Sequence, residues 1–185
     1  TGVYSLEGLV YGEYYVQETK APEYFVRDVN FYYFEIVNDG ETVEVSNDEL
    51  GKGTFINSPQ KGEIKIVKTS YDNKVEGIHF EVTGKTFTGQ PFSKIYTTDE
   101  NGIIRINDLR AGEYTIHEVK DEASAGYLLP EDKQLTIDRD GAMLVANMHN
   151  SKLPDNPPTG ASEDSFTQTA VIIISMVMMS AAVVL

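Results

Sequence analysis

Three polar residues stand where the alternation of a β-strand requires apolar side chains. Each of them ends an apolar row: Lys68 after Ile64 and Ile66, Glu118 after Tyr114 and Ile116, and Asn150 after Leu144, Ala146 and Met148. A polar group in a core is costly unless it is paired, neutralised or used in chemistry. These three residues are therefore the candidate site of the sequence.

A lysine, a glutamate and an asparagine together permit the formation of an amide bond. Burial lowers the pKa of Lys68, so its amine can be a neutral nucleophile, and raises the pKa of Glu118, so its carboxyl can hold and pass a proton. The amine would attack the side-chain carbonyl of Asn150 and release ammonia, and folding would supply the proximity. We expect a single-turnover, autocatalytic isopeptide bond and not an enzyme in the usual sense. A hydrogen-bonded cluster without a covalent bond is the alternative.

The asparagine of this trio has a rival on the same strand. Asn147 shares its parity with Met143 and Val145, whereas Asn150 shares its parity with the apolar row of the strand. The strand period favours Asn150, and the phase of the strand has to decide between the two.

The same pattern occurs twice in the chain. Residues 9–18 and 109–118 have Leu, Gly, Glu, Tyr and Glu in register, one hundred residues apart. A repeat of this length predicts tandem domains, each with its own copy of the glutamate. The first copy would consist of Glu18 and Asn57. Thr1 and Gly2 match Asn101 and Gly102, which lie well inside the second repeat unit, so we expect the numbering to begin within a domain. The lysine of the first copy would then lie upstream of Thr1.

Short strands separated by Gly, Asn and Asp turns, with no helical period, predict an all-β fold of tandem β-sandwiches. An open barrel is the alternative. We place the C-terminal part of one domain in residues 1–60 and a complete domain in residues 61–152. In the first domain we expect strands at 12–18, 30–37, 41–46 (a hairpin return) and 54–57. In the second we expect them at 63–69, 77–83, 92–97, 102–106, 113–118, 134–137 and 143–150.

Charge and composition exclude several classes of function. The net charge of −14 argues against a nucleic-acid-binding protein, which normally has a basic face. The absence of cysteine removes disulfides and thiolate metal sites. The three histidines are scattered along the sequence, so we expect no metal site and no cofactor.

These motifs resemble the collagen-adhesin B-type domain (CnaB-like, SpaA-like) of Gram-positive surface proteins and pilins. Residues 62–68 are similar to its opening strand, residues 109–118 and 9–24 to its glutamate-containing motif, and Asn57 and Asn150 to its closing asparagine. In the second domain the segment after the glutamate is stretched, with Ala125, Gly126 and Tyr127 further from Glu118 than usual. The resemblance implies prealbumin-like, inverse-immunoglobulin-like sandwiches.

The tail changes composition abruptly. Residues 153–165 are Pro-rich and polar, and residues 166–185 contain no charge, which predicts a transmembrane helix. The tail resembles a sortase sorting signal, in which Asn156, Pro157, Pro158, Thr159 and Gly160 take the place of the recognition pentapeptide. By this analogy, sortase would cut between Thr159 and Gly160 and link Thr159 to the peptidoglycan cell wall.

These features together predict the stalk or anchor region of an extracellular, cell-wall-anchored surface protein, or of a minor or basal pilin. The precursor would span the membrane through its C-terminal helix. The expected partners are sortase and the cell wall, with other pilin subunits or host matrix as further candidates. Two alternatives are an adhesin that binds host matrix directly and the wall anchor of an enzyme whose catalytic domain lies upstream.

Overall fold

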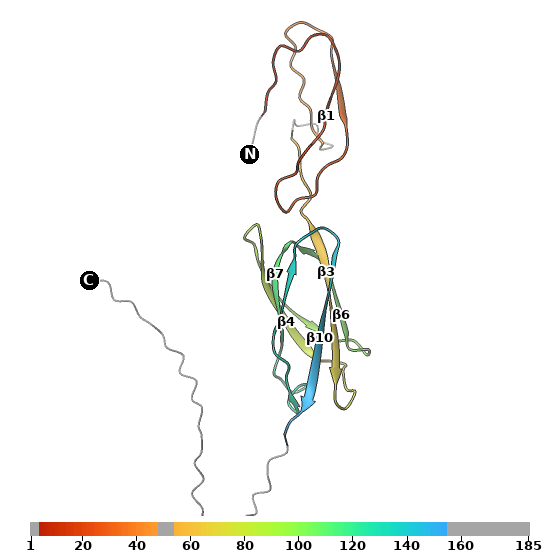
Figure 1. The fold of residues 1–185 in the computed structure, drawn as a ribbon, viewed down its shortest axis with the longest axis vertical. Coiled ribbons are helices and arrows are strands. Elements are labelled where there is room, and N and C mark those ends of the chain that lie inside the picture. Colours follow the sequence, from red (N-terminus) through yellow and green to blue (C-terminus); the bar gives the residue numbers. More distant parts are fainter. Residues whose placement is uncertain (1–3, 48–53, 155–185) are drawn as a thin grey trace, which may run out of the picture. The chain divides into compact units, whose positions relative to one another are not determined.

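The computed structural model describes residues 4–47 and 54–154 (Figure 1). In these ranges all regular structure consists of β-strands, which lie in one compact unit, Thr1–Leu153. The strands are β1 (Gly12–Val16), β2 (Tyr32–Ile36), β3 (Lys61–Ser70), β4 (His79–Thr86), β5 (Pro91–Thr97), β6 (Ile103–Arg110), β7 (Gly112–Glu118), β8 (Tyr127–Leu128), β9 (Lys133–Ile137) and β10 (Ala142–Lys152).

Strands β3 to β10 form a two-sheet sandwich. One sheet has the order β6-β3-β10-β8, and the other has the order β5-β4-β7-β9. Two separate four-stranded sheets confirm the predicted sandwich and exclude the open barrel. The first and the last strand of this module, β3 and β10, are parallel neighbours, with a register that runs from Ala142↔Gly62 to Asn150↔Ser70.

The alternation of apolar residues fills the space between the sheets. The inner faces supply a core of buried residues that includes Ile64, Ile66, Phe80, Val82, Ile116, Ile137 and Met148. On β3, β7 and β10 the same period continues to the strand end, where the next inward position is polar. Each of these strands therefore carries a polar side chain into the interior.

Residues 4–47 and 54–60, here called the first module, contain a smaller sheet; the sandwich of strands β3 to β10 is called the second module. β1 and β2 are antiparallel, and Gly12↔Ile36 and Tyr14↔Phe34 are paired residues. β7 and β9 repeat this register one module later, with Gly112↔Ile137 and Tyr114↔Leu135. The internal repeat of the sequence is thus also a repeat of strand pairing.

The predicted hairpin return at 41–46 is wrong, since these residues form no strand. The side chain of Glu41 accepts hydrogen bonds from the backbone N–H of Val37 and from Asn38 Nδ2. The Val37 N–H that would continue a ladder is therefore engaged by a side chain. Residues 54–57 are described, and they form no strand, so the strand expected there is also wrong. The regular pairing nearby is an isolated bridge between Phe25 and Pro59.

No helix in the part of the chain that the structure describes is long and apolar enough to cross a membrane. The expected span at 166–185 lies outside the described residues.

Candidate functional site

Lys68, Glu118 and Asn150 come together inside the second module. Lys68 lies on β3 and Asn150 on the neighbouring β10, whereas Glu118 ends β7 in the opposite sheet. Their exposed fractions are 1%, 1% and 0%. Two sheets therefore supply the three side chains to one buried site.

The contacts centre on the carboxyl group of Glu118. Asn150 Nδ2 lies 2.5 Å from Glu118 Oε1, and Lys68 Nζ lies 3.9 Å from Glu118 Oε2. Lys68 Nζ also donates a hydrogen bond of 2.6 Å to the carbonyl oxygen of Thr69. One carboxyl oxygen thus contacts the amide, and the other faces the amine.

Two polar atoms of this site have no hydrogen-bond partner. They are Glu118 Oε2 and Asn150 Oδ1, and both are buried. An unpaired buried acceptor costs on the order of 1–3 kcal/mol, so such an atom calls for a functional explanation. Asn150 Oδ1 belongs to the carbonyl that the predicted reaction would polarise.

Burial sets the protonation of the pair. Desolvation lowers the pKa of Lys68, although the negative charges of Glu118 and Asp72 oppose this shift. Desolvation raises the pKa of Glu118, against the hydrogen bond from Asn150 and the charge of Lys68. Both shifts favour the neutral pair, an amine beside a carboxylic acid, because neither charge is solvated.

A second polar cluster, not anticipated from the sequence, adjoins the same end of β3. The carboxylate of Asp72 accepts hydrogen bonds from the Tyr127 hydroxyl at 3.0 and 3.1 Å and from Ser70 Oγ at 2.9 Å. Burial acts to raise the pKa of Asp72, but these hydrogen bonds and one from the backbone of Lys74 lower it overall. Tyr127 is also in edge-on ring contact with Tyr71. No motif or period of the sequence links Asp72 to Tyr127, so this contact required the fold.

The phase of β10 separates the two candidate asparagines. Asn147 is exposed, while Asn150 points inward with Ala146 and Met148. Only Asn150 of the two has a hydrogen bond to Glu118.

The first module contains a similar pair. Asn57 Nδ2 donates to Glu18 Oε1 at 2.7 Å, and the backbone N–H of Asp28 donates to Glu18 Oε2 at 2.7 Å. Glu18 and Asn57 are half-buried. The repeat of the sequence is thus also a repeat of the glutamate–asparagine contact. The tail residues Asn156, Pro157, Pro158, Thr159 and Gly160 lie outside the described residues.

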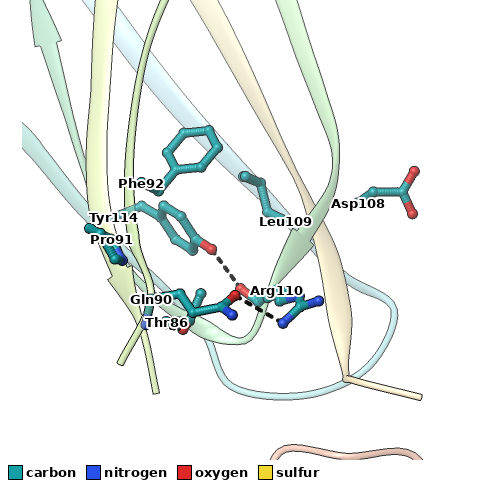
Figure 2. Close-up of a pocket in the computed structure, with 8 residues that line it drawn as sticks. All are labelled: Thr86, Gln90, Pro91, Phe92, Asp108, Leu109, Arg110 and Tyr114. Carbon is teal, nitrogen blue, oxygen red and sulfur yellow. Dashed lines mark hydrogen bonds between the residues drawn. The ribbon is translucent and has the colours of Figure 1, made fainter. Parts of the chain in front are cut away.

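The described residues also form a surface pocket of about 210 Å³ (Figure 2). Its lining includes Gln90, Phe92, Arg110 and Tyr114. The Tyr114 hydroxyl donates to the carbonyl oxygen of Arg110 at 2.7 Å, and Arg110 donates to Gln90 Oε1 at 2.9 Å. The Tyr114 hydroxyl and the side-chain oxygen of Gln90 are thus both engaged within the pocket, and none of Lys68, Glu118 and Asn150 lines it.

Fold and site define an all-β, prealbumin-like sandwich with a polar trio on its inner faces. The family model of the SpaA prealbumin-like fold domain matches residues 1–49 and 62–152, which make up most of the chain, and the chain belongs to this family. The resemblance inferred from the sequence motifs is therefore confirmed.

Solved structures share the fold. The Bacillus anthracis TIE protein matches with a TM-score of 0.58 and 24% identity, over 78% of this chain and 26% of that one. The C-terminal fragment of the pilus adhesin SpaC from Lactobacillus rhamnosus GG matches with a TM-score of 0.52 and 14% identity, over 82% and 81% of the two chains. This chain thus spans about a quarter of the TIE chain. No curated protein matches the sequence.

Proposed function

We propose that this chain is a structural stalk segment of a Gram-positive surface protein or pilus, stiffened by an internal amide bond between Lys68 and Asn150. The observation that carries the proposal is the burial of three polar side chains in one site, with the Glu118 carboxyl in contact with the amide and facing the amine. A purely structural core does not need polar residues at these positions, because well-packed apolar residues in place of a buried ion pair are often as stable or more stable.

The reaction joins the lysine nitrogen to the asparagine side chain. Neutral Lys68 Nζ attacks Cγ of Asn150, and the Glu118 carboxyl donates its proton to the carbonyl oxygen as the tetrahedral intermediate forms. This proton transfer requires that a half-turn of the Asn150 amide about χ2 has first exchanged Nδ2 and Oδ1, which brings the unpartnered Oδ1 to the carboxyl. The carboxylate then moves a proton from the attacking nitrogen to Nδ2, and the C–Nδ2 bond breaks to release ammonia. The hydroxyl proton returns to the Glu118 carboxylate as the carbonyl re-forms. The balance is one amine and one primary amide in, and one secondary amide and one ammonia out. Each site reacts once, so we propose no turnover enzyme.

Such a bond would change how the module bears force. β3 enters the module at Lys61 and β10 leaves it at Lys152, and the two strands are parallel neighbours. Tension on the two chain ends would shear β3 against β10. A covalent link from Lys68 to Asn150 would take this tension before the ladder of hydrogen bonds does. The proposed role as a stalk follows from this geometry.

We extend the proposal to the tail on the sequence alone. Residues 156–160 would be the sortase signal, with Thr159 linked to the cell wall, and residues 166–185 would hold the precursor in the membrane before cleavage. The protein would then be extracellular and wall-anchored, either as a minor or basal pilin or as a non-polymerised surface protein.

The intact mass of the full chain tests the isopeptide bond. We expect the wild-type mass to be lower than the calculated mass by one ammonia for the second module, and fragmentation to yield a crosslinked peptide pair that contains Lys68 and Asn150. The variant Glu118→Gln, which keeps the size of the side chain, should have the full calculated mass. Asn147→Ala is the matched control on the same strand and should keep the deficit.

Two results would overturn the proposal for the bond. One is a full calculated mass for the folded wild type. The other is a deficit that survives in Lys68→Met while circular dichroism reports a folded sandwich. The anchoring proposal is tested separately by Thr159→Ala in a Gram-positive host, where muramidase should release wild type but not the variant from the wall fraction.

A further inference from the structure

The outer face of the β1–β2 sheet has different side chains from the corresponding face of β7 and β9 in the second module. It carries three aromatic side chains and two carboxylates: Tyr15, Phe31, Tyr33, Glu13 and Glu35, here named the aromatic face. The exposed fractions of Tyr15, Phe31 and Tyr33 are 59%, 48% and 75%. Exposed aromatic residues that contact one another are unusual on a free protein surface and mark interaction sites.

The repeat identifies this face as an outer face and not as an open core. Tyr14 donates its hydroxyl to the carbonyl of Val10 at 2.7 Å, just as buried Tyr114 does to Arg110 at 2.7 Å. Tyr14 therefore points inward, and its neighbour Tyr15 points to the opposite side of the sheet. The aromatic face is thus directed away from the side on which the core of the module forms.

The matched positions of the second module are polar. Tyr15↔Tyr33 corresponds to Thr115↔Gln134. Glu13↔Glu35 corresponds to Glu113↔Thr136, and Phe31 takes the place of Asp132, which contacts His117 at 2.7 Å. The shared fold therefore does not require aromatic residues here.

The three rings form one continuous surface. Tyr15 lies 5.1 Å from Phe31 and 5.9 Å from Tyr33 between ring centroids, and Phe31 lies 6.3 Å from Tyr33. The rings meet at edge-on and tilted angles as well as stacked ones, so ring faces and edges are both accessible. Their π-faces are electron-rich and attract cations.

The two carboxylates beside the rings are an unfavourable pair. Glu13 and Glu35 are directly opposite each other in the ladder, two positions from Tyr15 and Tyr33 on the same face. Both are exposed, and the structure gives neither side chain an ion pair or hydrogen bond to another described residue. Like charges at directly opposed positions destabilise a sheet, and a cation between them relieves this cost.

We propose that the aromatic face binds an arginine- or lysine-rich extended segment of a partner protein. A guanidinium or ammonium group would lie between Glu13 and Glu35, and a second would stack on the rings of Tyr15 and Tyr33. Charge decides between possible occupants. A second copy of this chain would bring a net charge of −14 against the same two carboxylates, and an acidic polymer would be repelled in the same way.

Titration of the full chain with a fluorescent nine-residue peptide of alternating arginine and glycine tests this proposal. The variant Tyr15→Thr/Tyr33→Gln copies the outer face of the second module and should weaken binding about ten-fold. Tyr15→Phe/Tyr33→Phe keeps the rings and should bind as wild type does. Glu13→Gln/Glu35→Gln should also weaken binding and reduce its salt dependence. Glu113→Gln in the second module is the matched control and should change nothing.

Four results would overturn the proposal. The first is the absence of peptide binding, and the second is equal binding by Tyr15→Thr/Tyr33→Gln and wild type. The third is a loss of peptide affinity in Glu113→Gln as large as that in Glu13→Gln/Glu35→Gln. The fourth is preferential binding of a neutral oligosaccharide. The third would mean general charge attraction, and the fourth a sugar-binding face. Hydrogen exchange of β1 and β2 amides verifies that each variant keeps the sheet. If Tyr15→Thr/Tyr33→Gln fails to fold, Glu13→Gln/Glu35→Gln keeps the test decisive, since equal binding by this variant and wild type would overturn the proposal.

Discussion

Removal of the lysine nucleophile gives the sharpest test of the proposed bond. The variant Lys68→Met replaces a fully buried amine with an apolar side chain of similar length, so the core stays filled. The neutral Glu118 keeps its contact with Asn150. The main change is then the loss of the covalent link between β3 and β10.

The expected magnitude follows from loop closure. A bond from Lys68 to Asn150 closes a loop of roughly 80 residues, which in the chain-entropy model used for disulfides stabilises the folded state by about 4.5 kcal/mol. In a domain of this size, where 1 kcal/mol corresponds to about 4–8 °C, its loss lowers the midpoint of thermal unfolding on the order of 20–30 °C. The unfolded variant is also less constrained, so its denaturant m-value should rise.

Hydrogen exchange of the β3 and β10 amides during denaturant titration measures this effect for the second module alone. Asn147→Ala is the control, since this exposed side chain lies on the opposite face of β10, and its stability should stay within about 0.5 kcal/mol of wild type. The loop-closure reasoning would be refuted if the wild type has the ammonia deficit but its free energy of unfolding exceeds that of Lys68→Met by less than about 1 kcal/mol. An unchanged m-value would refute the account of the unfolded state.

Three further outcomes are expected. Ammonia release after the denatured, unreacted chain is folded by dilution should have a bell-shaped pH dependence, since the reaction needs Lys68 neutral and Glu118 protonated. Because burial lowers the pKa of Lys68 from its ordinary 10.5 and raises that of Glu118 from its ordinary 4.5, the rise should end below pH 10.5 and the fall should begin above pH 4.5; a rate that still rises beyond pH 10.5 would contradict the assignment. Hydrogen bonds from the Tyr32 hydroxyl, the backbone of Asn30 and the side chain of Asn47 lower the pKa of Asp28 to about 2. The Asp28 carboxylate should therefore stabilise the first module above pH 3.8, and this stabilisation should be lost as the pH falls through 2. An NMR titration midpoint near 3.8 for Asp28 would contradict this. Gly84→Ala should destabilise the second module by about 1–3 kcal/mol in a thermal melt, because the new Cβ would collide with the carbonyl oxygen of Glu113. Gly126→Ala, which has open space around its Cβ position, is the control. Equal stability of the two variants would contradict the steric argument.

Alternation predicted most of the second module. The rows that end at Lys68, Glu118 and Asn150 are buried except for the partly buried Leu144, and the strand positions agree with the structure to within a few residues at each end. A period of two is a strong signal here because each sheet has one face in the core and one in water. In the first module the same signal failed at 41–46, where Glu41 engages the N–H of Val37 and no ladder continues.

The sequence by itself determined the fold class, the family and the identity of the buried trio, because these depend on local period and on motif spacing. The distances within the trio and the unpaired Asn150 Oδ1 came only from the packing of one sheet on the other, which also confirmed the inward phase of Asn150 that the strand period favoured over Asn147. The same holds for Asp72 and Tyr127, and for the meeting of Tyr15, Tyr33 and Phe31 on one outer face. These residues are distant in sequence, and strand pairing and sheet packing, which no local pattern encodes, bring them into contact.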